Sequence, residues 1–172
     1  MIIVTGGAGF IGSSFVWKLN QQGIDDILIV DNLATKENWR NLIGLKFADY
    51  MQKDQFIENL NAPILKNTKA IIHLGACSAT TEMNGDYLMD NNFHYTKKLA
   101  EWAQNNGVYF MYASSAATYG DGAQGFNDDH EGLDTLSPIN RYGYSKHLFD
   151  LYARRQGWLD QIVGLKFFNV YG

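Results

Sequence analysis

The chain has few of the residues that are typical of secreted, membrane or metal-binding proteins. Cys77 is the one cysteine among 172 residues, so no internal disulfide is possible, which fits a reducing compartment such as the cytoplasm. No apolar run approaches the roughly 20 residues of a membrane-spanning helix. The first apolar residues belong to a predicted strand rather than to a signal peptide. We therefore expect a cytoplasmic protein without a membrane partner.

Positive charge is also in short supply. The chain has 14 Lys and Arg against 18 Asp and Glu, a formal net charge of -4 at pH 7. This charge provides no basic field for nucleic acid or an anionic membrane. The four histidines are scattered without metal-ligand spacing, so we expect packing or surface histidines and no metal site. The apolar share of 46% is enough for one domain with a substantial core over residues 1–172.

Glycine is plentiful at the start of the chain. Residues 1–5 (MIIVT) are apolar and rich in β-branched side chains, which is typical of a buried strand, and GGAGFIG follows directly. Gly6, Gly9 and Gly12 are spaced three apart. The next apolar positions recur four apart, on one face of a predicted helix: Ile11, Phe15 and Leu19. Glycines at such a strand-to-helix turn permit a tight turn, close helix packing and close approach of a ligand.

An acidic residue stands about 20 residues further on. Residues 27–30 (ILIV) form a second predicted strand, and Asp31 follows it. A carboxylate there accepts hydrogen bonds from the adenosine ribose of a dinucleotide, although a loop Asp that caps the next helix is the alternative. Strand, glycines, helix and acid together predict a dinucleotide site, with the pyrophosphate at the helix N-terminus. A P-loop is excluded because no Gly-Lys-Ser/Thr follows the glycines.

Predicted strands and helices alternate along the rest of the chain. This alternation indicates an α/β fold, a doubly wound parallel sheet of a Rossmann-like dinucleotide-binding domain. Further strands are expected at 46–49, 69–74, 108–113 and 161–168, and helices up to 42 and at 52–60, 86–106 and 142–156, with an irregular loop at 121–138. Ligands of such sheets bind outside the carboxyl ends of the strands. The unusual residues all fall at those ends: the glycines, Asp31, residues 75–78, Ser115 and Asn169.

A tyrosine and a lysine four residues apart are the candidate chemical groups. Tyr142 and Lys146 lie near the start of a predicted helix, one turn apart on one face. An ammonium and a cationic nicotinamide both favour the phenolate form of a tyrosine, which can then take a hydroxyl proton while hydride leaves for the cofactor. Ser115, after a predicted strand, can bond the same substrate oxygen. A surface tyrosine beside a lysine is the alternative, and the glycine turn favours the catalytic interpretation.

Several motifs give the chain a family resemblance. TGGAGFIG, SSAATYG, Y-x-x-x-K and FNVYG together resemble the extended short-chain dehydrogenase/reductase family over the whole chain. Within that family, GACSATTE and ADYM resemble the epimerases of ADP-heptoses. The resemblance implies an NADP-dependent isomerase of lipopolysaccharide inner-core precursor synthesis. Such an enzyme inverts the 6'' carbon of an ADP-heptose by transient oxidation to a ketone and re-reduction. A bacterial, cytoplasmic homo-oligomer, a pentamer, is also implied.

The resemblance assigns roles to individual residues. Tyr142 matches an acid/base residue, Lys146 its partner, Ser115 the hydroxyl that binds the substrate oxygen, and Asn169 a further substrate contact. Tyr142 and Lys146 also match cofactor contacts. The remaining cofactor positions are Gly6, Gly9, Phe10, Ile11, Gly12, Asp31, Asn32, Lys53, Leu74, Gly75, Ala76, Cys77, Ser78, Asn91 and Val170.

Two features depart from the family pattern. Asn38 stands where the family has a lysine for the 2'-phosphate of NADP; Lys36 or Arg40 can substitute, whereas Asp31 alone favours NAD. The family's second acid/base, a lysine just beyond FNVYG, and its smaller C-terminal substrate domain are absent, because the chain stops at Gly172. We expect either a fragment of a longer protein or a protein that cannot complete the reaction, so the chain alone is expected to be inactive.

Three other functions compete with this interpretation. A 4,6-dehydratase carries an Asp-Glu pair just after the Ser115 position, where this chain has Ala116 and Ala117, so dehydration is disfavoured. A 4-epimerase of UDP-hexoses would use the same chemistry, and GACSATTE and ADYM weigh against it. A non-catalytic dinucleotide-binding module is favoured by the missing second lobe and disfavoured by the intact Tyr142 and Lys146.

Overall fold

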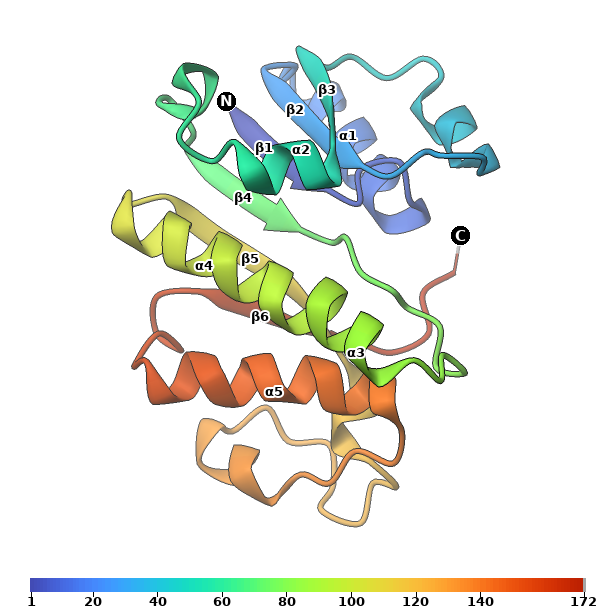
Figure 1. Ribbon diagram of the computed structural model, residues 1–172, viewed down its shortest axis with the longest axis vertical. Coiled ribbons are helices and arrows are strands. Elements are labelled where there is room, and N and C mark those ends of the chain that lie inside the picture. Colours follow the sequence, from blue (N-terminus) through green and yellow to red (C-terminus); the bar gives the residue numbers. More distant parts are fainter. Residues whose placement is uncertain (172) are drawn as a thin grey trace. The chain divides into compact units, whose positions relative to one another are not determined.

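A six-stranded parallel sheet with the strand order β3-β2-β1-β4-β5-β6 runs through the computed structural model, which describes residues 1–171 (Figure 1). This order, with helices between the strands, confirms the predicted doubly wound, Rossmann-like fold. The strands are β1 (Ile2–Thr5), β2 (Ile27–Asp31), β3 (Asp49–Gln52), β4 (Ala70–His73), β5 (Tyr109–Ser115) and β6 (Val163–Phe167). The α-helices are α1 (Phe10–Gln21), α2 (Lys53–Glu58), α3 (Gly85–Leu88), α4 (Tyr95–Asn105) and α5 (Arg141–Arg155).

Shorter helical turns connect these elements. Four are 3-10 turns, and one, η3, is a π-helical segment between α3 and α4. They are η1 (Glu37–Leu42), η2 (Pro63–Leu65), η3 (Met89–His94), η4 (Ala116–Tyr119) and η5 (His130–Thr135). Gly172, the last residue of the FNVYG segment, lies outside the described residues. No helix of the described part is long and apolar enough to cross a membrane.

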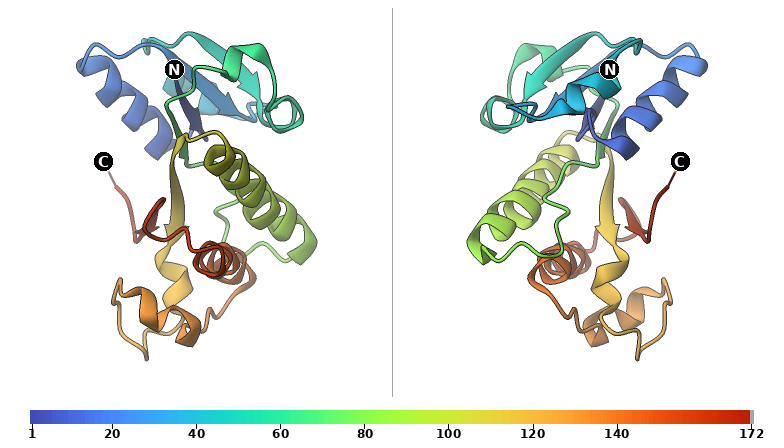
Figure 2. Two further views of the ribbon diagram at one scale, coloured as in Figure 1. Left: turned by 90° about the vertical axis from the view of Figure 1, so that its left-hand side faces the viewer. Right: turned by 90° about the vertical axis from the view of Figure 1, so that its right-hand side faces the viewer.

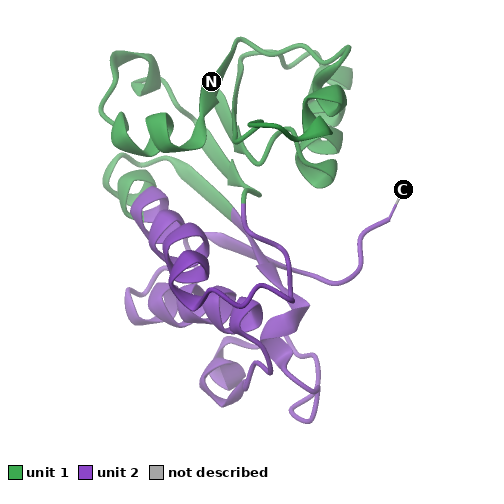
Figure 3. Cartoon of the chain, turned by 45° about the vertical axis from the view of Figure 1, so that its right-hand side comes forward, with its two compact units in different colours: residues 1–75, 101–111 green, residues 76–100, 112–172 purple. Residues whose placement is uncertain are grey.

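The chain divides into two compact units, shown in different colours in Figure 3 and described separately below. Unit 1 comprises residues 1–75 and 101–111, and unit 2 comprises residues 76–100 and 112 onward. In unit 1, α1 and α2 lie on opposite sides of the strands (Figure 2). The strands of its core, β1 and β2, are fully buried over most of their length, as expected for parallel strands covered on both faces.

Helix α1 packs on the sheet with a slightly different face from the predicted one. Gly12, Val16 and Leu19 are its buried residues, whereas Ile11 and Phe15 are half-buried. The buried face of α1 therefore begins at Gly12. Because glycine has no side chain, the first turn of the helix lies very close to the backbone of Gly6.

Two predicted elements were wrong in detail. The third strand begins at Asp49 rather than at 46, because the Asn20 side chain bonds both backbone groups of Lys46, at 2.7 and 2.8 Å, before β3 pairs with β2. The single helix predicted over 86–106 is instead α3, η3 and α4 in succession. The loop predicted over 121–138 contains a short 3-10 helix, η5.

Helix α5 organises unit 2 and confirms the helix predicted over 142–156. Asn140 caps its start, because the Asn140 side chain accepts the Gly143 N–H at 2.7 Å. Gly157, with φ of 71°, follows its end, as glycine often does after helices. Eight residues of the helix are buried, among them Tyr142 and Lys146.

Candidate active site

Two of the three glycines in the unit 1 turn are required by internal packing. Gly6 has φ of 67°, and a β-carbon there would lie 2.6 Å from the backbone nitrogen of Gly75. A β-carbon at Gly12 would overlap the carbonyl oxygen of Gly6. Neither position has room for a side chain, so these glycines hold the first turn of α1 against the end of β1.

Gly9 is less tightly enclosed than Gly6 and Gly12. A β-carbon at Gly9 would meet one neighbouring atom within 4 Å, the Gly6 carbonyl oxygen at 3.1 Å. Gly9 is also the N-cap of α1, and no side chain of the described residues caps this helix. Phe10, the first residue of α1, is 50% exposed. An accessible helix start with free N–H groups suits an anionic group such as a pyrophosphate.

The Asp31 carboxylate is bonded to the glycine turn itself. Its Oδ2 accepts the Ala8 N–H at 2.8 Å, and its Oδ1 accepts the Asn32 N–H at 2.7 Å. The Asn41 side chain donates to the Ala8 carbonyl at 2.9 Å, a contact that the sequence did not predict. Each Asp31 oxygen keeps a lone pair for a further donor, so the predicted ribose contact is compatible with this geometry.

The candidate cations for a 2'-phosphate follow β2 and β3. Lys53 comes directly after Gln52, which pairs with Asp31 in the sheet. The Lys53 Nζ lies 2.8 Å from Asp54, and this hydrogen bond lowers the pKa of the Asp54 carboxyl. Arg40 bonds Glu37 at 2.6 Å and lies 5.4 Å over the Trp39 ring. These pairs are largely exposed, so each cation can change partner at little cost.

Asn38 takes part in none of these pairs. Its Oδ1 is buried and has no hydrogen-bond partner among the described residues. An unpartnered buried oxygen is uncommon, and this one lies in η1, between β2 and β3.

The end of β4 supplies the remaining predicted contacts of unit 1. Leu74 and Gly75 are half-buried, and the Gly75 N–H donates to Thr5 Oγ1 at 3.2 Å. The same hydroxyl lies 2.6 Å from His73 Nδ1. His73 is 1% exposed and stacks on Phe110, so it is a packing histidine, as predicted.

In unit 2, Tyr142 and Lys146 lie one turn apart on the buried side of α5. Tyr142 is 8% exposed and Lys146 is 4% exposed. The Lys146 Nζ donates to the Ala113 carbonyl on β5 at 2.8 Å. Burial lowers the pKa of Lys146 to about 8, and the charges of Asp150 and Cys77 oppose that fall. Lys146 therefore remains mainly an ammonium at neutral pH.

Ser115 is held close to the start of α5. It ends β5 and is the N-cap of η4, where its Oγ accepts the Ala117 N–H at 3.1 Å. A β-carbon on Gly143, the neighbour of Tyr142, would lie 2.6 Å from the Ala117 carbonyl oxygen. The turn after Ser115 thus contacts the backbone of the residue after Tyr142, and the structure brings the three predicted catalytic residues into one part of unit 2.

Asn92 is a residue that sequence reasoning missed. It is 1% exposed, lies in η3, and bonds both backbone groups of Cys77, at 2.9 and 3.0 Å. It also donates to Ser145 Oγ at 3.0 Å, and Ser145 donates in turn to the Tyr142 carbonyl at 2.7 Å. Asn92 therefore connects the segment after β4 to the first turn of α5. An asparagine within a helical pattern was the available signal, because its side chain competes for backbone groups.

The other predicted contacts of unit 2 lie on its surface or half-buried. Ala76, Cys77 and Asn91 are half-buried and Ser78 is exposed. Asn169 and Val170, after β6, are both exposed. Their roles stay predictions.

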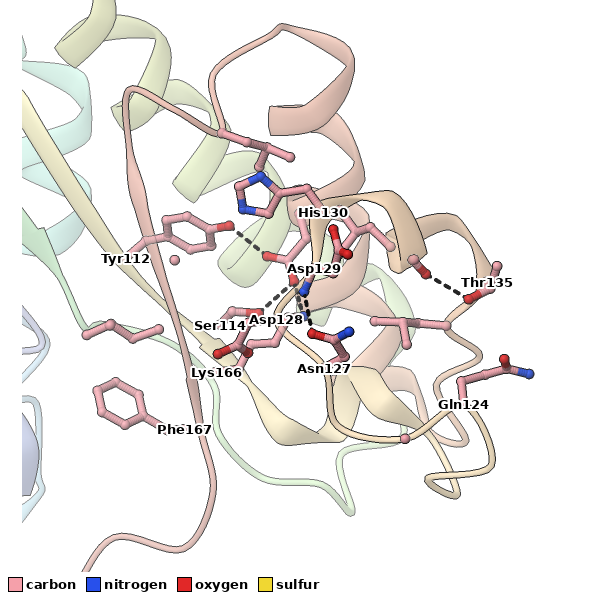
Figure 4. Close-up of a pocket in the computed structure, with 18 of the residues that line it drawn as sticks. Tyr112, Ser114, Gln124, Asn127, Asp128, Asp129, His130, Thr135, Lys166 and Phe167 are labelled. Atoms are coloured by element: carbon pink, nitrogen blue, oxygen red, sulfur yellow. Dashed lines mark hydrogen bonds and ion pairs between the residues drawn. The ribbon is translucent and has the colours of Figure 1, made fainter.

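A cavity of about 620 Å³ lies elsewhere in unit 2 (Figure 4). Its lining includes Tyr112, Ser114, Lys166 and the segment around His130, and none of Ser115, Tyr142 and Lys146. The residues of the described part include no group of three or more His, Cys, Asp or Glu that could hold a metal ion.

A glycine turn at the carboxyl end of β1, an acid as the last residue of β2 and this strand order define a dinucleotide-binding protein of the α/β class. Over residues 2–172 the sequence matches the NAD dependent epimerase/dehydratase family, and the chain belongs to that family.

Individual relatives are similar over the same region. The ADP-L-glycero-D-manno-heptose-6-epimerase of Nitratidesulfovibrio vulgaris is 55% identical over 173 residues, covering all of this chain and 54% of the relative. The crystal structure of the Helicobacter pylori ADP-L-glycero-D-manno-heptose-6-epimerase is 29% identical with a TM-score of 0.77, over 99% of this chain and 55% of that one. The UDP-glucose 4-epimerase of Thermus thermophilus, in complex with NAD, is 27% identical with a TM-score of 0.74, over 99% and 56%. The chain thus spans about half the length of the curated relatives it matches.

Proposed function

We propose that this chain is the cofactor-binding and catalytic part of an ADP-L-glycero-D-manno-heptose 6-epimerase. The proposed reaction converts ADP-D-glycero-D-manno-heptose to the L-glycero form at the 6'' carbon, with NADP as the cofactor. Its support is the family membership, the 55% identity to a curated epimerase of that name, and the geometry of Tyr142 and Lys146.

The residues of unit 1 fit a dinucleotide. The uncapped start of α1 at Gly9 suits the pyrophosphate, and Asp31 suits the adenosine ribose. Preference for NADP over NAD is assigned to Lys36 and Arg40, which follow β2, and to Lys53, which directly follows β3. In unit 2, Lys146 would hold the nicotinamide ribose as well as act on Tyr142.

The residues of unit 2 suit proton transfer at a secondary alcohol. When bound, NADP supplies the acceptor for the hydride that leaves the 6'' carbon, and its reduced form supplies the donor that returns the hydride to that carbon. The Tyr142 phenolate takes the hydroxyl proton as the carbonyl forms, and the phenol returns a proton on reduction. The Lys146 ammonium stabilises the phenolate, and the Ser115 hydroxyl donates to the substrate oxygen. The single observation that carries this proposal is the burial of Tyr142 and Lys146 one turn apart on α5.

Residues next to Ser115 disfavour dehydration. Ala116 and Ala117 occupy η4, so no titratable side chain follows Ser115 in that turn until Tyr119, whose hydroxyl donates to Asp128 at 2.8 Å. Burial raises the pKa of Tyr119 to about 12, so this tyrosine stays protonated at neutral pH.

The proposal extends to the cellular role. An ADP-heptose epimerase acts on a small nucleotide sugar, in lipopolysaccharide inner-core precursor biosynthesis in the cytoplasm, and the resemblance gives a homo-oligomer, a pentamer. The net charge of -4 fits a partner that is neither nucleic acid nor an anionic membrane.

Replacement of Tyr142 tests this proposal. Tyr142→Phe removes the titratable hydroxyl and keeps the ring, so turnover of ADP-heptose by the complete natural protein should fall by at least about 100-fold, the usual effect of losing a positioned acid/base. The Kd for NADP, titrated by fluorescence, should hardly change. Tyr144→Phe is the matched control, because Tyr144 lies on the same helix and is 52% exposed. Near-normal turnover in Tyr142→Phe would overturn the mechanism.

A further inference from the structure

A buried ion pair lies one helical turn beyond Lys146. Asp150 is 3% exposed, and its Oδ2 lies 2.7 Å from the Nζ of Lys166 on β6. The Asp150 carboxylate also accepts the hydroxyls of Tyr112 and Ser114 on β5, each at 2.8 Å. Figure 4 shows Tyr112, Ser114 and Lys166 at the wall of the cavity where these bonds meet. The proposed reaction makes no direct use of either charge.

From Lys166 the hydrogen bonds continue to the turn that carries Ser115. The Lys166 Nζ donates to Thr118 Oγ1 at 2.7 Å, and the Thr118 hydroxyl donates to the Ser115 carbonyl at 2.7 Å. Thr118 is fully buried, and the Lys166 ammonium lies 5.1 Å over the Tyr119 ring. An unbroken series of bonds therefore joins α5 to Ser115 through β6 and η4.

Asp150 also acts on Lys146 directly. The two residues are four apart on α5, so their side chains share one face. The charge of Asp150 favours the ammonium form of Lys146 against the effect of burial. Cys77, in the segment after β4, acts in the same direction, and the Ala113 carbonyl on β5 accepts the Lys146 ammonium.

We propose that Asp150 and Lys166 are a positioning pair for the reaction, which fixes the turn of Ser115 against α5 and keeps a negative charge beside Lys146. This inference rests on the proposed function. The two residues touch neither substrate nor cofactor in it and act through Ser115 and Lys146. A purely structural brace is the competing explanation. Buried ion pairs generally add little net stability over apolar side chains of similar size, which favours a functional reason for this one.

Separate variants test the two actions in the complete natural protein. Asp150→Asn removes the charge beside Lys146, so the alkaline limb of the kcat–pH profile should move to lower pH by about one unit, the usual effect of one nearby charge. Lys166→Met leaves that charge in place and removes the link to Thr118. The kcat of Lys166→Met should fall by up to about 100-fold, the effect expected when a group is displaced by about 1 Å. Its Kd for NADP should stay unchanged, and the alkaline limb of its kcat–pH profile should not move to lower pH.

Two further variants control for folding and for charge. Asp150→Asn/Lys166→Met removes both charges together and so avoids an unpaired buried ion, and it should show both effects. Arg154→Met/Asp134→Asn removes a more exposed ion pair, which joins α5 to η5, and should leave kcat and the pH profile unchanged. A double Asp150/Lys166 variant with wild-type kcat and pH profile, and a change in Tm alone, would overturn the proposal.

A measurement without substrate separates this inference from the proposed function. NMR titration of the Lys146 side chain in the cofactor-free protein should give a lower pKa in Asp150→Asn than in the wild type. An unchanged titration would overturn the electrostatic action even if ADP-heptose is the substrate. Failure of the wild-type protein to epimerise ADP-heptose would overturn the proposed function, and the titration would still decide whether Asp150 acts on Lys146.

Discussion

Gly6, Gly9 and Gly12 have different tasks, although the sequence spaces them alike. A β-carbon at Gly6 or Gly12 would strike backbone atoms of the turn or of Gly75, so these two glycines serve the fold. A β-carbon at Gly9 would meet one backbone atom, at 3.1 Å, and Gly9 is the N-cap of α1, so we expect its missing side chain to leave room for a ligand. Spacing alone did not distinguish the two tasks, because the difference depends on which atoms the fold brings near each residue.

A bulky residue at position 9 is expected to block the cofactor without unfolding the chain. Gly9→Val should abolish NADP binding in calorimetry at concentrations that saturate the wild type. The loss of stability should be about 1 kcal/mol, the usual effect of a poor N-cap residue. Gly132→Val is the control, because Gly132 has nothing within 4 Å of its β-carbon position and lies in unit 2. If Gly9→Val binds NADP as tightly as the wild type, the pyrophosphate site lies elsewhere.

The placement of individual residues in the candidate site was predictable where a short spacing within one helix determines it. The four-residue spacing of Tyr142 and Lys146 placed both residues on one face of a helix, and the structure confirms that helix. Asn92 and Asn41 were not predictable in this way. Their partners lie far along the chain, at Cys77 and Ser145 for Asn92 and at Ala8 for Asn41. Such contacts exist only once the strands and helices have assembled.

At the scale of elements, helix and strand types were predictable but some boundaries were not. Apolar periodicity predicted one helix over 86–106, and it does not distinguish a π-helical segment from an α-helix. The π-helical turn at Met89–His94 places Asn92 where it bonds Cys77 and Ser145. The β3 boundary was missed because Asn20, 26 residues earlier, holds the backbone of Lys46.

The contact between α5 and η4 makes a prediction at this scale. Because a β-carbon at Gly143 would lie 2.6 Å from the Ala117 carbonyl, Gly143→Ala must push α5 away from the turn of Ser115. Overpacking of this kind costs about 1–3 kcal/mol, which urea unfolding should detect. Turnover should fall as well, since the displacement separates Ser115 from Tyr142. Gly85→Ala, whose β-carbon would be 3.9 Å from its nearest neighbour, is the control. Wild-type stability of Gly143→Ala would contradict this packing argument.

At the scale of the whole molecule, net charge opposes the proposed cofactor. The chain carries a formal charge of -4 at pH 7, and the 2'-phosphate makes NADP more negative than NAD. A preference for NADP must therefore come from cations placed locally. Lys36, Arg40 and Lys53 follow the carboxyl ends of β2 and β3. The partners of Arg40 and Lys53 are exposed carboxylates, so a phosphate can replace those partners at little cost.

Neutralising these three cations is expected to change cofactor preference. A variant with Lys36→Gln, Arg40→Gln and Lys53→Gln should lose affinity for NADP more than for NAD, since the lost contacts involve the 2'-phosphate alone. Its NADP affinity should also depend less on salt, because fewer ion pairs remain to be screened. Calorimetry with both cofactors at two ionic strengths measures each effect.

The control for this variant changes the net charge by the same amount at the other end of the strands. Lys46, Lys66 and Lys69 are exposed and precede β3 or β4, whereas the glycine turn follows the carboxyl end of β1. Their replacement by glutamine lowers the formal charge from -4 to -7, as the first triple variant does. A general charge effect would weaken NADP binding equally in both variants. A loss confined to the first variant, and larger for NADP than for NAD, would support recognition of the 2'-phosphate, and equal losses for both cofactors would contradict it.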